Sequence, residues 1–387
     1  MVVIPCHNEP DLITSLQSLH ACQRPDCAVE VIVVINGACD SPAQVREQNE
    51  RSFQDALEWS KQHATPAFAI HVLNFPDLPR KEAGVGLARK IGMDEALWRL
   101  ALGGESDGVI ACFDADCQCA TNYLQEVVKH FREIPGAPGC SIYFEHPLSG
   151  DEPAEVYEAI ALYELHLRYY VEALRYAGFP FAFQTVGSSM AVRAGVYREQ
   201  GGMNKRKAGE DFYFLHKIIP LGGFSNLTRT TVFPSPRPSD RVPFGTGKAV
   251  RRFLENGEMP GYPLKAFQDL KLLFAQVPAL HAGESLPLLP EALQTFCDSM
   301  GLNALLQEIR GNTSTLSAFE NRFFRRFNGF QVMKFVHHAS RGFYGAGDVR
   351  DEAIALLREI EPHLAERSSF NPVELLKIYR QRALLSG

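Results

Sequence analysis

The 387-residue sequence lacks several features that would exclude or define a class of protein at once. No apolar segment approaches the roughly 20 residues that a membrane-spanning helix needs. The formal net charge is -6, whereas general nucleic-acid binding usually requires a strongly basic face. The first residues, 1–5, are typical of a strand and not of a signal peptide. We therefore expect a cytoplasmic protein with no transmembrane segment and no nucleic-acid partner, and peripheral membrane association stays open.

Three common cofactor motifs are also missing. The nine cysteines include no pair of Cys-x-x-Cys units that could form a zinc framework, so reduced thiols fit best. No Gly-x-Gly-x-x-Gly follows the first apolar run, and no Walker lysine loop is present. These absences weigh against a structural zinc protein, a simple Rossmann dehydrogenase and a P-loop enzyme.

The sequence does contain apolar runs that alternate with helical patterns. Runs typical of strands are each followed by a polar loop and a segment of helical spacing, and they lie at residues 1–5, 29–35, 68–73 and 109–113. Four such alternations predict an α/β fold with a mainly parallel sheet flanked by helices. Ligands of such sheets bind at the carboxyl ends of the strands.

Polar side chains follow each of the four predicted strands. They include Glu9, Asp40, Lys81 and the pair Asp114 and Asp116. In an extended chain, residues at i and i+2 point to the same side, so the two aspartates could face one hard cation and a phosphate that it carries. Four loops that meet at one edge predict a binding site there.

Further along, the pattern becomes less regular. We expect a strand at Cys140–Phe144, a long helix from about Pro153 to Tyr176 and two short strands within Phe181–Val192. An acidic pair, Glu210 and Asp211, then opens an apolar helix. Carboxylates at a helix start can serve as caps, because they favour that end of the macrodipole, and they can equally supply a catalytic base.

A basic segment follows, rich in proline and glycine, and it holds the cations Arg237, Arg241 and Lys248. It could be a lid that neutralises a diphosphate or simply a solvated surface. The composition beyond it is helical. We therefore predict an α/β domain over residues 1–235, a loop or lid over 236–250 and a mostly helical region over 251–387.

Five motifs together resemble the glycosyltransferase family 2 proteins, which have the GT-A fold. In the family's order they are Val2–Glu9, Val31–Asp40, Gly84–Arg89, Phe113–Asp116 and Gly209–Asp211. The resemblance covers roughly residues 1–230. It implies an enzyme that moves one sugar from a nucleoside-diphosphate sugar, with a UDP-sugar favoured, to an acceptor hydroxyl.

The resemblance also implies roles for single residues. The loop with Pro5 and Glu9, together with Asp40, would hold the base and ribose, and Lys81 and Arg89 would contact phosphate or base. Asp116, supported by Asp114, would hold Mg²⁺ or Mn²⁺ on the diphosphate. In an inverting reaction Asp211 would deprotonate the acceptor, with Glu210 as its neighbour. That list of roles is the site we expect.

The sequence departs from the family pattern in two respects, and two alternative functions stay open. The Gln-x-x-Arg-Trp motif of processive family members is missing, which favours a single transfer to a carbohydrate, lipid-linked or small-molecule acceptor. Residues 251–387 match no motif and could shape the acceptor site or form a homo-oligomer contact. The alternatives are a sugar nucleotidyltransferase, whose glycine-rich first loop is missing, and a non-catalytic relative that binds a sugar nucleotide.

Overall fold

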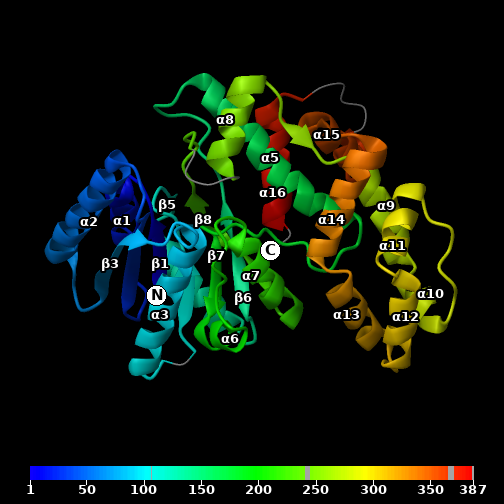
Figure 1. Ribbon diagram of the computed structural model, residues 1–387, viewed down its shortest axis with the longest axis horizontal. Helices are drawn as coiled ribbons and strands as arrows, with labels where there is room; N and C mark the ends of the chain where they lie inside the picture. The colour runs from blue at the N-terminus through cyan, green and yellow to red at the C-terminus, as the bar shows by residue number, and fades with distance from the viewer. Residues whose placement is uncertain (106, 240–244, 365–369, 386–387) are drawn as a thin grey trace. The chain divides into compact units, whose positions relative to one another are not determined.

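The structure is a computed structural model that describes residues 1–105, 107–239, 245–364 and 370–385 (Figure 1). The chain divides into two compact units. The first contains Met1–Ile160, Thr185–Glu255 and Leu384–Gly387, and the second contains Ala161–Gln184 and Asn256–Ala383. Helix α5 (Ala154–Tyr176) contributes to both units. The boundaries expected at residues 235 and 250 stay a prediction.

The first unit is built around one mixed sheet, whose strands in the described residues follow the order β3-β2-β1-β4-β7-β6-β8-β5. Their bounds are β1 (Val2–Cys6), β2 (Val29–Ala38), β3 (Phe68–Leu78), β4 (Val109–Cys112), β5 (Gln118–Cys119), β6 (Gly139–Phe144), β7 (Met190–Arg193) and β8 (Ser225–Phe233). Strands β3, β2, β1 and β4 are parallel, and so are β6 and β8, while β7 and β5 run antiparallel to their neighbours. The expected α/β fold with a mainly parallel sheet is thereby confirmed.

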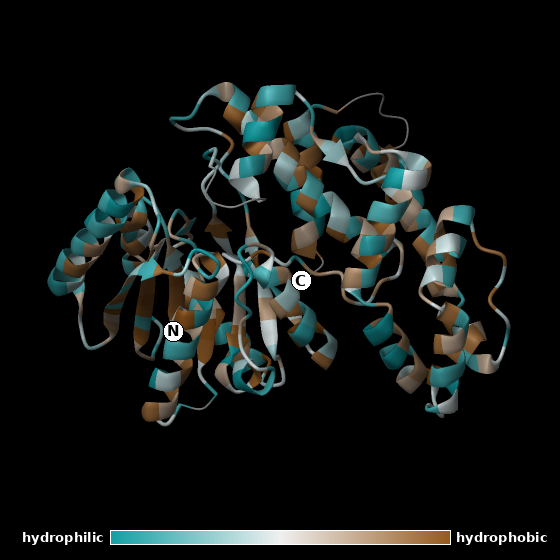
Figure 2. Cartoon of the chain, in the orientation of Figure 1, coloured by the Kyte–Doolittle hydropathy of each residue, from teal (hydrophilic) through white to brown (hydrophobic). Residues whose placement is uncertain are grey.

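The parallel strands form the core of this unit because their side chains are apolar on both faces. Residues Val31–Ile35 of β2 are fully buried, and Val3 of β1 pairs with Ile32 in register. Such unbroken apolar runs are typical of parallel strands that helices cover on both sides. Figure 2 shows the strands in brown and much of the surface of α2 in teal.

Helices of the first unit cover the sheet and lead into the loops at its edge. Their bounds are α1 (Leu12–His20), α2 (Ala43–His63), α3 (Val85–Leu102), α4 (Tyr123–Glu133), α6 (Ala194–Glu199), α7 (Glu210–Ile218), the 3₁₀ turn η1 (Ile219–Leu221) and α8 (Thr246–Asn256). With right-handed connections, the strand order β3-β2-β1-β4 places α1 and α2 on one face and α3 on the other. The loops after β1, β2 and β4 therefore share one edge.

The second unit is mostly helical, as expected. Besides part of α5, its elements are β9 (Pro260–Gly261), α9 (Leu264–Ala275), α10 (Val277–Ala282), α11 (Glu291–Ser299), α12 (Leu302–Gly311), α13 (Leu316–Arg326), α14 (Gly329–Ala339), the π-helical turn η2 (Ser340–Tyr344), β10 (Gly347–Asp348), α15 (Val349–Ile360), η3 (Pro362–Leu364) and α16 (Pro372–Leu385). No helix in the described parts of the chain is long and apolar enough to cross a membrane.

Two local expectations were wrong. Only β7 forms within residues 181–192, because the segment before it turns at Gly187 and gives its carbonyl to a side chain. The segment 236–250 is also not a loop throughout, since α8 begins at Thr246. Its last proline precedes residue 245, so no proline interrupts a helix from that point. Lys248 therefore lies on a helix.

Candidate active site

The two aspartates of the Phe113–Asp116 motif lie in a tight turn that follows the end of β4. The N–H of Phe113 still bonds to the sheet at Val3, 3.0 Å away, but the N–H of Cys117 then closes on the carbonyl of Asp114 at 3.1 Å. The extended backbone that we assumed for Asp114 and Asp116 is therefore wrong. Both residues are half-buried, and both follow the carboxyl end of a central strand.

A buried arginine joins this turn to the acidic pair about a hundred residues further along. Arg89, in the second turn of α3, is 1% exposed. Its guanidinium donates to Oδ1 of Asp114 at 3.0 Å, to Oε1 of Glu210 at 3.2 Å and to the carbonyl of Gly187 at 2.9 Å. Burial disfavours the charged guanidinium, but the charges of Asp114 and Glu210 outweigh burial and raise the pKa of Arg89. The arginine is a fixed cation.

Asp211 lies beside this cluster, on the first turn of α7. The backbone enters that helix through Gly209, whose φ of 68° lies in the left-handed region that favours glycine. A Cβ added at Gly187 would lie 3.1 Å from Oδ2 of Asp211 and 2.8 Å from a guanidinium nitrogen of Arg89, so this close approach also requires glycine. Gly187 therefore leaves room for both the carboxylate of Asp211 and the guanidinium of Arg89.

The surroundings of Asp211 raise the pKa of its carboxyl group. Burial, and then the charge of Glu210, raise the pKa of Asp211 to about 7, although Arg89 and the N–H of Phe212 offset part of the rise. That N–H donates to Oδ1 of Asp211 at 2.7 Å. The residue keeps part of its surface exposed. A partly accessible carboxyl with a pKa near neutrality can take and return a proton under ordinary conditions.

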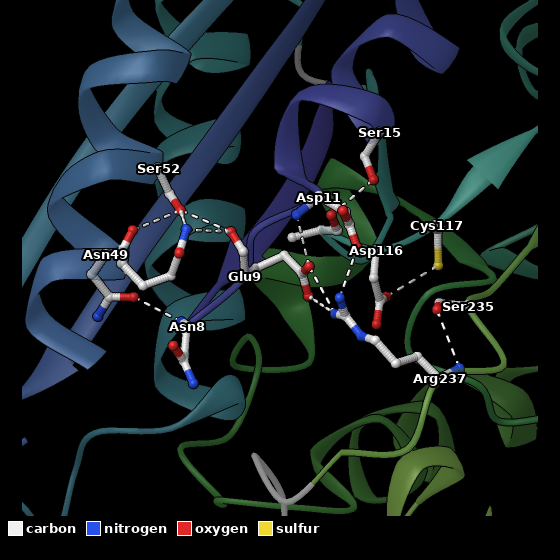
Figure 3. A network of polar contacts seen from close by, with 12 residues as sticks. Asn8, Glu9, Asp11, Ser15, Asn49, Ser52, Asp116, Cys117, Ser235 and Arg237 are labelled. Atoms are coloured by element: carbon white, nitrogen blue, oxygen red, sulfur yellow. Dashed lines mark hydrogen bonds and ion pairs between the residues drawn. The ribbon is translucent and has the colours of Figure 1, made fainter. Parts of the chain in front are cut away.

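The first-strand loop is held by a cation from a distant part of the chain (Figure 3). Glu9 is fully buried, and its two carboxylate oxygens accept from Nη2 of Arg237 at 2.8 and 2.9 Å. Arg237 also pairs with Asp11 at 2.7 Å, and the N–H of Asp11 donates to Glu9 at 2.9 Å. Arg237, which we placed in a diphosphate lid, therefore contacts the loop predicted to bind the nucleotide.

The other expected residues lie as follows. Pro5 is buried in β1, Asp40 pairs with Arg80 at 3.2 Å near the surface, and Lys81 is exposed. Lys248 is exposed on α8, and Arg241 lies outside the described residues. The structure thus brings Arg89, Asp114, Glu210 and Asp211 into one cluster and Glu9 and Arg237 into a second contact.

A metal at this site would need ligands beyond the protein. Within the part of the chain that the structure describes, no group of three or more His, Cys, Asp or Glu residues could hold a metal ion. Burial, followed by the charges of Asp116 and Asp114, raises the pKa of Cys117, so its thiol stays protonated beside Asp116. The donors on offer are two carboxylates, which fits a hard cation that reaches the site with phosphate oxygens.

Sequence reasoning missed two members of these contacts. Gly187 accepts from Arg89, and Asp11 shares Arg237 with Glu9. The glycine stands in an unremarkable Val-Gly-Ser run, and the aspartate resembles an ordinary helix cap. The chain separates them from their partners by 98 and 226 residues. No local pattern could have indicated these pairings.

Comparison with known protein families finds a match. The model described as glycosyl transferase family 2 matches residues 1–190. Over these residues, slightly less than half of the chain, the sequence is similar to the glycosyl transferases of family 2, which supports an enzyme of that class. A comparison with curated protein sequences finds no match.

Among solved structures, the chain is similar to TarS of S. aureus. Residues 1–349 of TarS in complex with UDP-GlcNAc align at 14% identity with a TM-score of 0.41, covering 100% of this chain and 88% of that one. The same fragment in complex with UDP aligns at 13% identity with a TM-score of 0.41, covering 88% and 90%. A structure of the same fragment, described with no ligand, aligns at 13% identity with a TM-score of 0.40, covering 88% of this chain and 90% of that one.

Proposed function

We propose that the chain transfers a single sugar from a nucleoside-diphosphate sugar to the hydroxyl of a carbohydrate, lipid-linked or small-molecule acceptor, with inversion. One observation carries the proposal beyond the family assignment. The guanidinium of Arg89 holds Asp114, from the strand-end motif, and Glu210, beside Asp211, in a single cluster. Donor and acceptor groups must be adjacent for transfer, and this arginine makes the two acidic motifs adjacent.

The donor nucleotide would lie at the carboxyl ends of β1 and β2. The loop with Pro5 and Glu9, together with Asp40, would hold base and ribose, and Lys81 would reach a phosphate. A UDP-sugar is favoured. Arg89 is enclosed by three protein acceptors. We therefore assign it a positioning role. Arg237 pairs with Glu9 and Asp11, so it would likewise position the first-strand loop. Lys248, with Arg241 from the segment outside the described residues, would offer positive charge to the diphosphate.

Asp116, supported by Asp114, would hold the Mg²⁺ or Mn²⁺ ion. Mg²⁺ commonly takes one or two carboxylates and completes its shell with substrate phosphates, which suits a site with two aspartates and a protonated thiol. A bound cation supplies Lewis-acid stabilisation of the charge that develops on the departing diphosphate. Asp114 shares its Oδ1 with Arg89, so Asp116 is the principal ligand in this proposal.

Asp211 would act as the base. Its carboxylate removes the proton of the acceptor hydroxyl as that oxygen bonds to the anomeric carbon, and the bond from that carbon to the diphosphate oxygen breaks on the opposite face. The pKa of about 7 suits this role, because a base works best when its pKa lies near the operating pH. Glu210 keeps the pKa of Asp211 high, and Arg89 keeps the carboxylate of Glu210 in place.

A thermal-shift screen tests the donor half of the proposal. UDP, GDP, CMP and their sugars are added with and without Mn²⁺, and a ligand at 100 times its Kd stabilises the fold by about 2.7 kcal/mol. We expect one nucleotide class to raise Tm by several degrees with Mn²⁺. Asp116→Ala should lose this Mn²⁺-dependent shift, whereas Asp55→Ala, an exposed carboxylate on α2, should keep it. No shift with any nucleotide, or an unchanged shift in Asp116→Ala, would contradict the proposal.

A further inference from the structure

Two cysteines that are 97 residues apart in the sequence lie in contact. The Sγ atoms of Cys22 and Cys119 are 3.6 Å apart. Cys22 follows the end of α1, and Cys119 is the last residue of β5, three positions after Asp116. Both are free thiols in the structure. Neither residue belongs to the site described above.

The backbone on both sides of the pair is fixed by hydrogen bonds. The N–H of Gln23 donates to the carbonyl of Thr121 at 2.7 Å. The hydroxyl oxygen of Ser18, one turn before Cys22, accepts from the N–H of Cys119 at 2.9 Å. A disulfide has an S–S length of about 2.05 Å, so the sulfurs must approach by about 1.5 Å, a distance that side-chain rotation can supply. The fold therefore holds the pair ready for a covalent bond.

The surroundings make the two sulfurs chemically unequal. The hydrogen bond from the Cys119 thiol, followed by those from the N–H groups of Leu124 and Tyr123 at the start of α4, lowers the pKa of Cys22 despite its burial. The charge of Arg24 adds to this effect. The same hydrogen bond, now with Cys119 as donor, raises the pKa of Cys119. Cys22 is thus the thiol of the pair that ionises more readily, and thiolates are the reactive form of cysteine.

We propose that Cys22 and Cys119 form a reversible intramolecular disulfide when the protein meets a peroxide. The Cys22 thiolate attacks hydrogen peroxide, gives a sulfenic acid and releases hydroxide. The Cys119 thiol then displaces water from that sulfenic acid and forms the S–S bond. In sum, two thiols are oxidised to one disulfide while one peroxide is reduced to two waters. A dithiol reverses the step by thiol–disulfide exchange.

The disulfide would join the end of α1 to the strand that directly follows the Phe113–Asp116 motif. It would close a loop of nearly a hundred residues, and long closed loops restrict the unfolded chain most. The 4% exposure of Cys22 favours a small oxidant, and Cys119 is the more exposed of the two. This inference is independent of the proposed donor and acceptor, so each can fail without the other.

The test uses the full chain. Protein treated with hydrogen peroxide is denatured without reductant, alkylated with N-ethylmaleimide, digested and analysed by mass spectrometry. We expect a peptide that links Cys22 to Cys119, seven alkylated cysteines in place of nine and a Tm several degrees higher, all reversed by dithiothreitol. Failure to find the linked peptide, or conversion of Cys22 to sulfinic acid instead, would overturn the proposal.

Matched variants separate this pair from incidental oxidation. Cys27 and Cys39 are exposed cysteines, so the double variant Cys27→Ser, Cys39→Ser should form the same link and gain the same Tm. Cys119→Ser should lose both. A Tm rise that survives in Cys119→Ser, or that disappears in the Cys27/Cys39 variant, would refute the assignment. The linked peptide in the parent protein decides the question even if Cys119→Ser does not fold.

Discussion

The guanidinium of Arg89 lies in the protein interior with carboxylates of Asp114 and Glu210 within 3.2 Å. Glu210 is buried and Asp114 is half-buried, and two such carboxylates near each other repel. Removal of one partner from a buried charge cluster typically costs about 3–5 kcal/mol. Arg89 offsets the repulsion and leaves Asp211 as the carboxyl with a raised pKa. The arrangement separates the roles of the acids, because the arginine binds Asp114 and Glu210 while Asp211 keeps a proton available for exchange.

The raised pKa of Asp211 affects the free energy of unfolding, and this effect can be measured without any substrate. The pKa of Asp211 is about 7 in the folded protein and 3.8 ordinarily, so between these values the folded chain binds a proton that the unfolded chain does not. The free energy of unfolding therefore falls as pH rises from about 4 to 7, and the penalty is complete above 7. Asp211→Asn removes the ionisation, and we expect it to raise Tm by a few degrees at pH 8 and by less at pH 5.

Differential scanning calorimetry of parent and variant at both pH values checks this prediction. Asp55→Asn, an exposed position on the same unit, serves as the control and should leave Tm unchanged at both. A variant that is less stable than the parent at pH 8, or equally stabilised at pH 5 and pH 8, would show that the pKa of Asp211 is not raised.

Single residues also show what the sequence can and cannot predict. The sequence places Asp114 and Asp116 at a strand end and Glu210 and Asp211 at a helix start, and the resemblance to family 2 implies that the two pairs belong to one site. It does not predict that the carboxylate of Glu9 is buried under Arg237, since 228 residues separate them and neither lies in a pattern that names the other. Pairings of this kind depend on how the chain packs, and no local period in the sequence reports them.

At the level of elements, α3 carries Arg89 and must pack closely on β1 for the arginine to reach its partners. Gly92 makes that approach possible. A Cβ added there would lie 2.4 Å from Cγ1 of Val3 and 3.1 Å from Cγ2 of Val34, and both valines are fully buried. A glycine within a helix ordinarily lowers stability relative to alanine. If Gly92→Ala lowers the free energy of unfolding instead of raising it, close packing outweighs helix propensity at this position.

We predict that Gly92→Ala destabilises the first unit by about 1–3 kcal/mol, the usual cost of overpacking. Urea denaturation followed by tryptophan fluorescence measures the change, because both tryptophans, Trp59 and Trp98, lie in this unit. Gly136→Ala is the control, since a Cβ there meets nothing within 4 Å. Stabilisation by Gly92→Ala would mean that α3 does not pack on β1 as closely as described.

Most strands and helices of the first unit were predictable, because buried parallel strands and amphipathic helices leave clear periods in the sequence. In the second unit, one apolar period runs from Ala292 to Ile309, and the chain forms two helices there, α11 and α12. Gly301 lies between them with φ of 65°, a conformation that ends a right-handed helix. The period continues across such a break, so periodicity alone cannot locate it.

The whole molecule consists of two compact units, and the second has its own buried charge network. Glu164 on α5 is fully buried and accepts from Arg168 at 2.7 Å and from Arg380 of α16 at 2.8 and 2.7 Å. These three residues belong to the same unit and tie its first helix to its last. The C-terminal helix is therefore part of the core of this unit.

Arg380→Gln should destabilise the second unit by about 3 kcal/mol, because it leaves a buried carboxylate with less compensating charge. Arg326→Gln is the matched control: Arg326 pairs with Glu308, both side chains are 58% exposed, and such pairs contribute about 1 kcal/mol or less. Calorimetric unfolding compares the two. Equal effects would indicate that the Glu164 network does not stabilise the unit.

The central claim is that the Arg89 cluster joins a donor half, with Asp114 next to the proposed metal ligand Asp116, to an acceptor half, with Asp211. The most direct test is the rate at which Asp211→Asn releases nucleoside diphosphate in the presence of acceptor at saturating donor and Mn²⁺, relative to the parent and to Asp55→Asn. We predict a rate at least about 100-fold lower, with donor affinity unchanged, because a general base contributes 10²–10⁴-fold. A rate within about twofold of the parent, under the same conditions, would contradict the account.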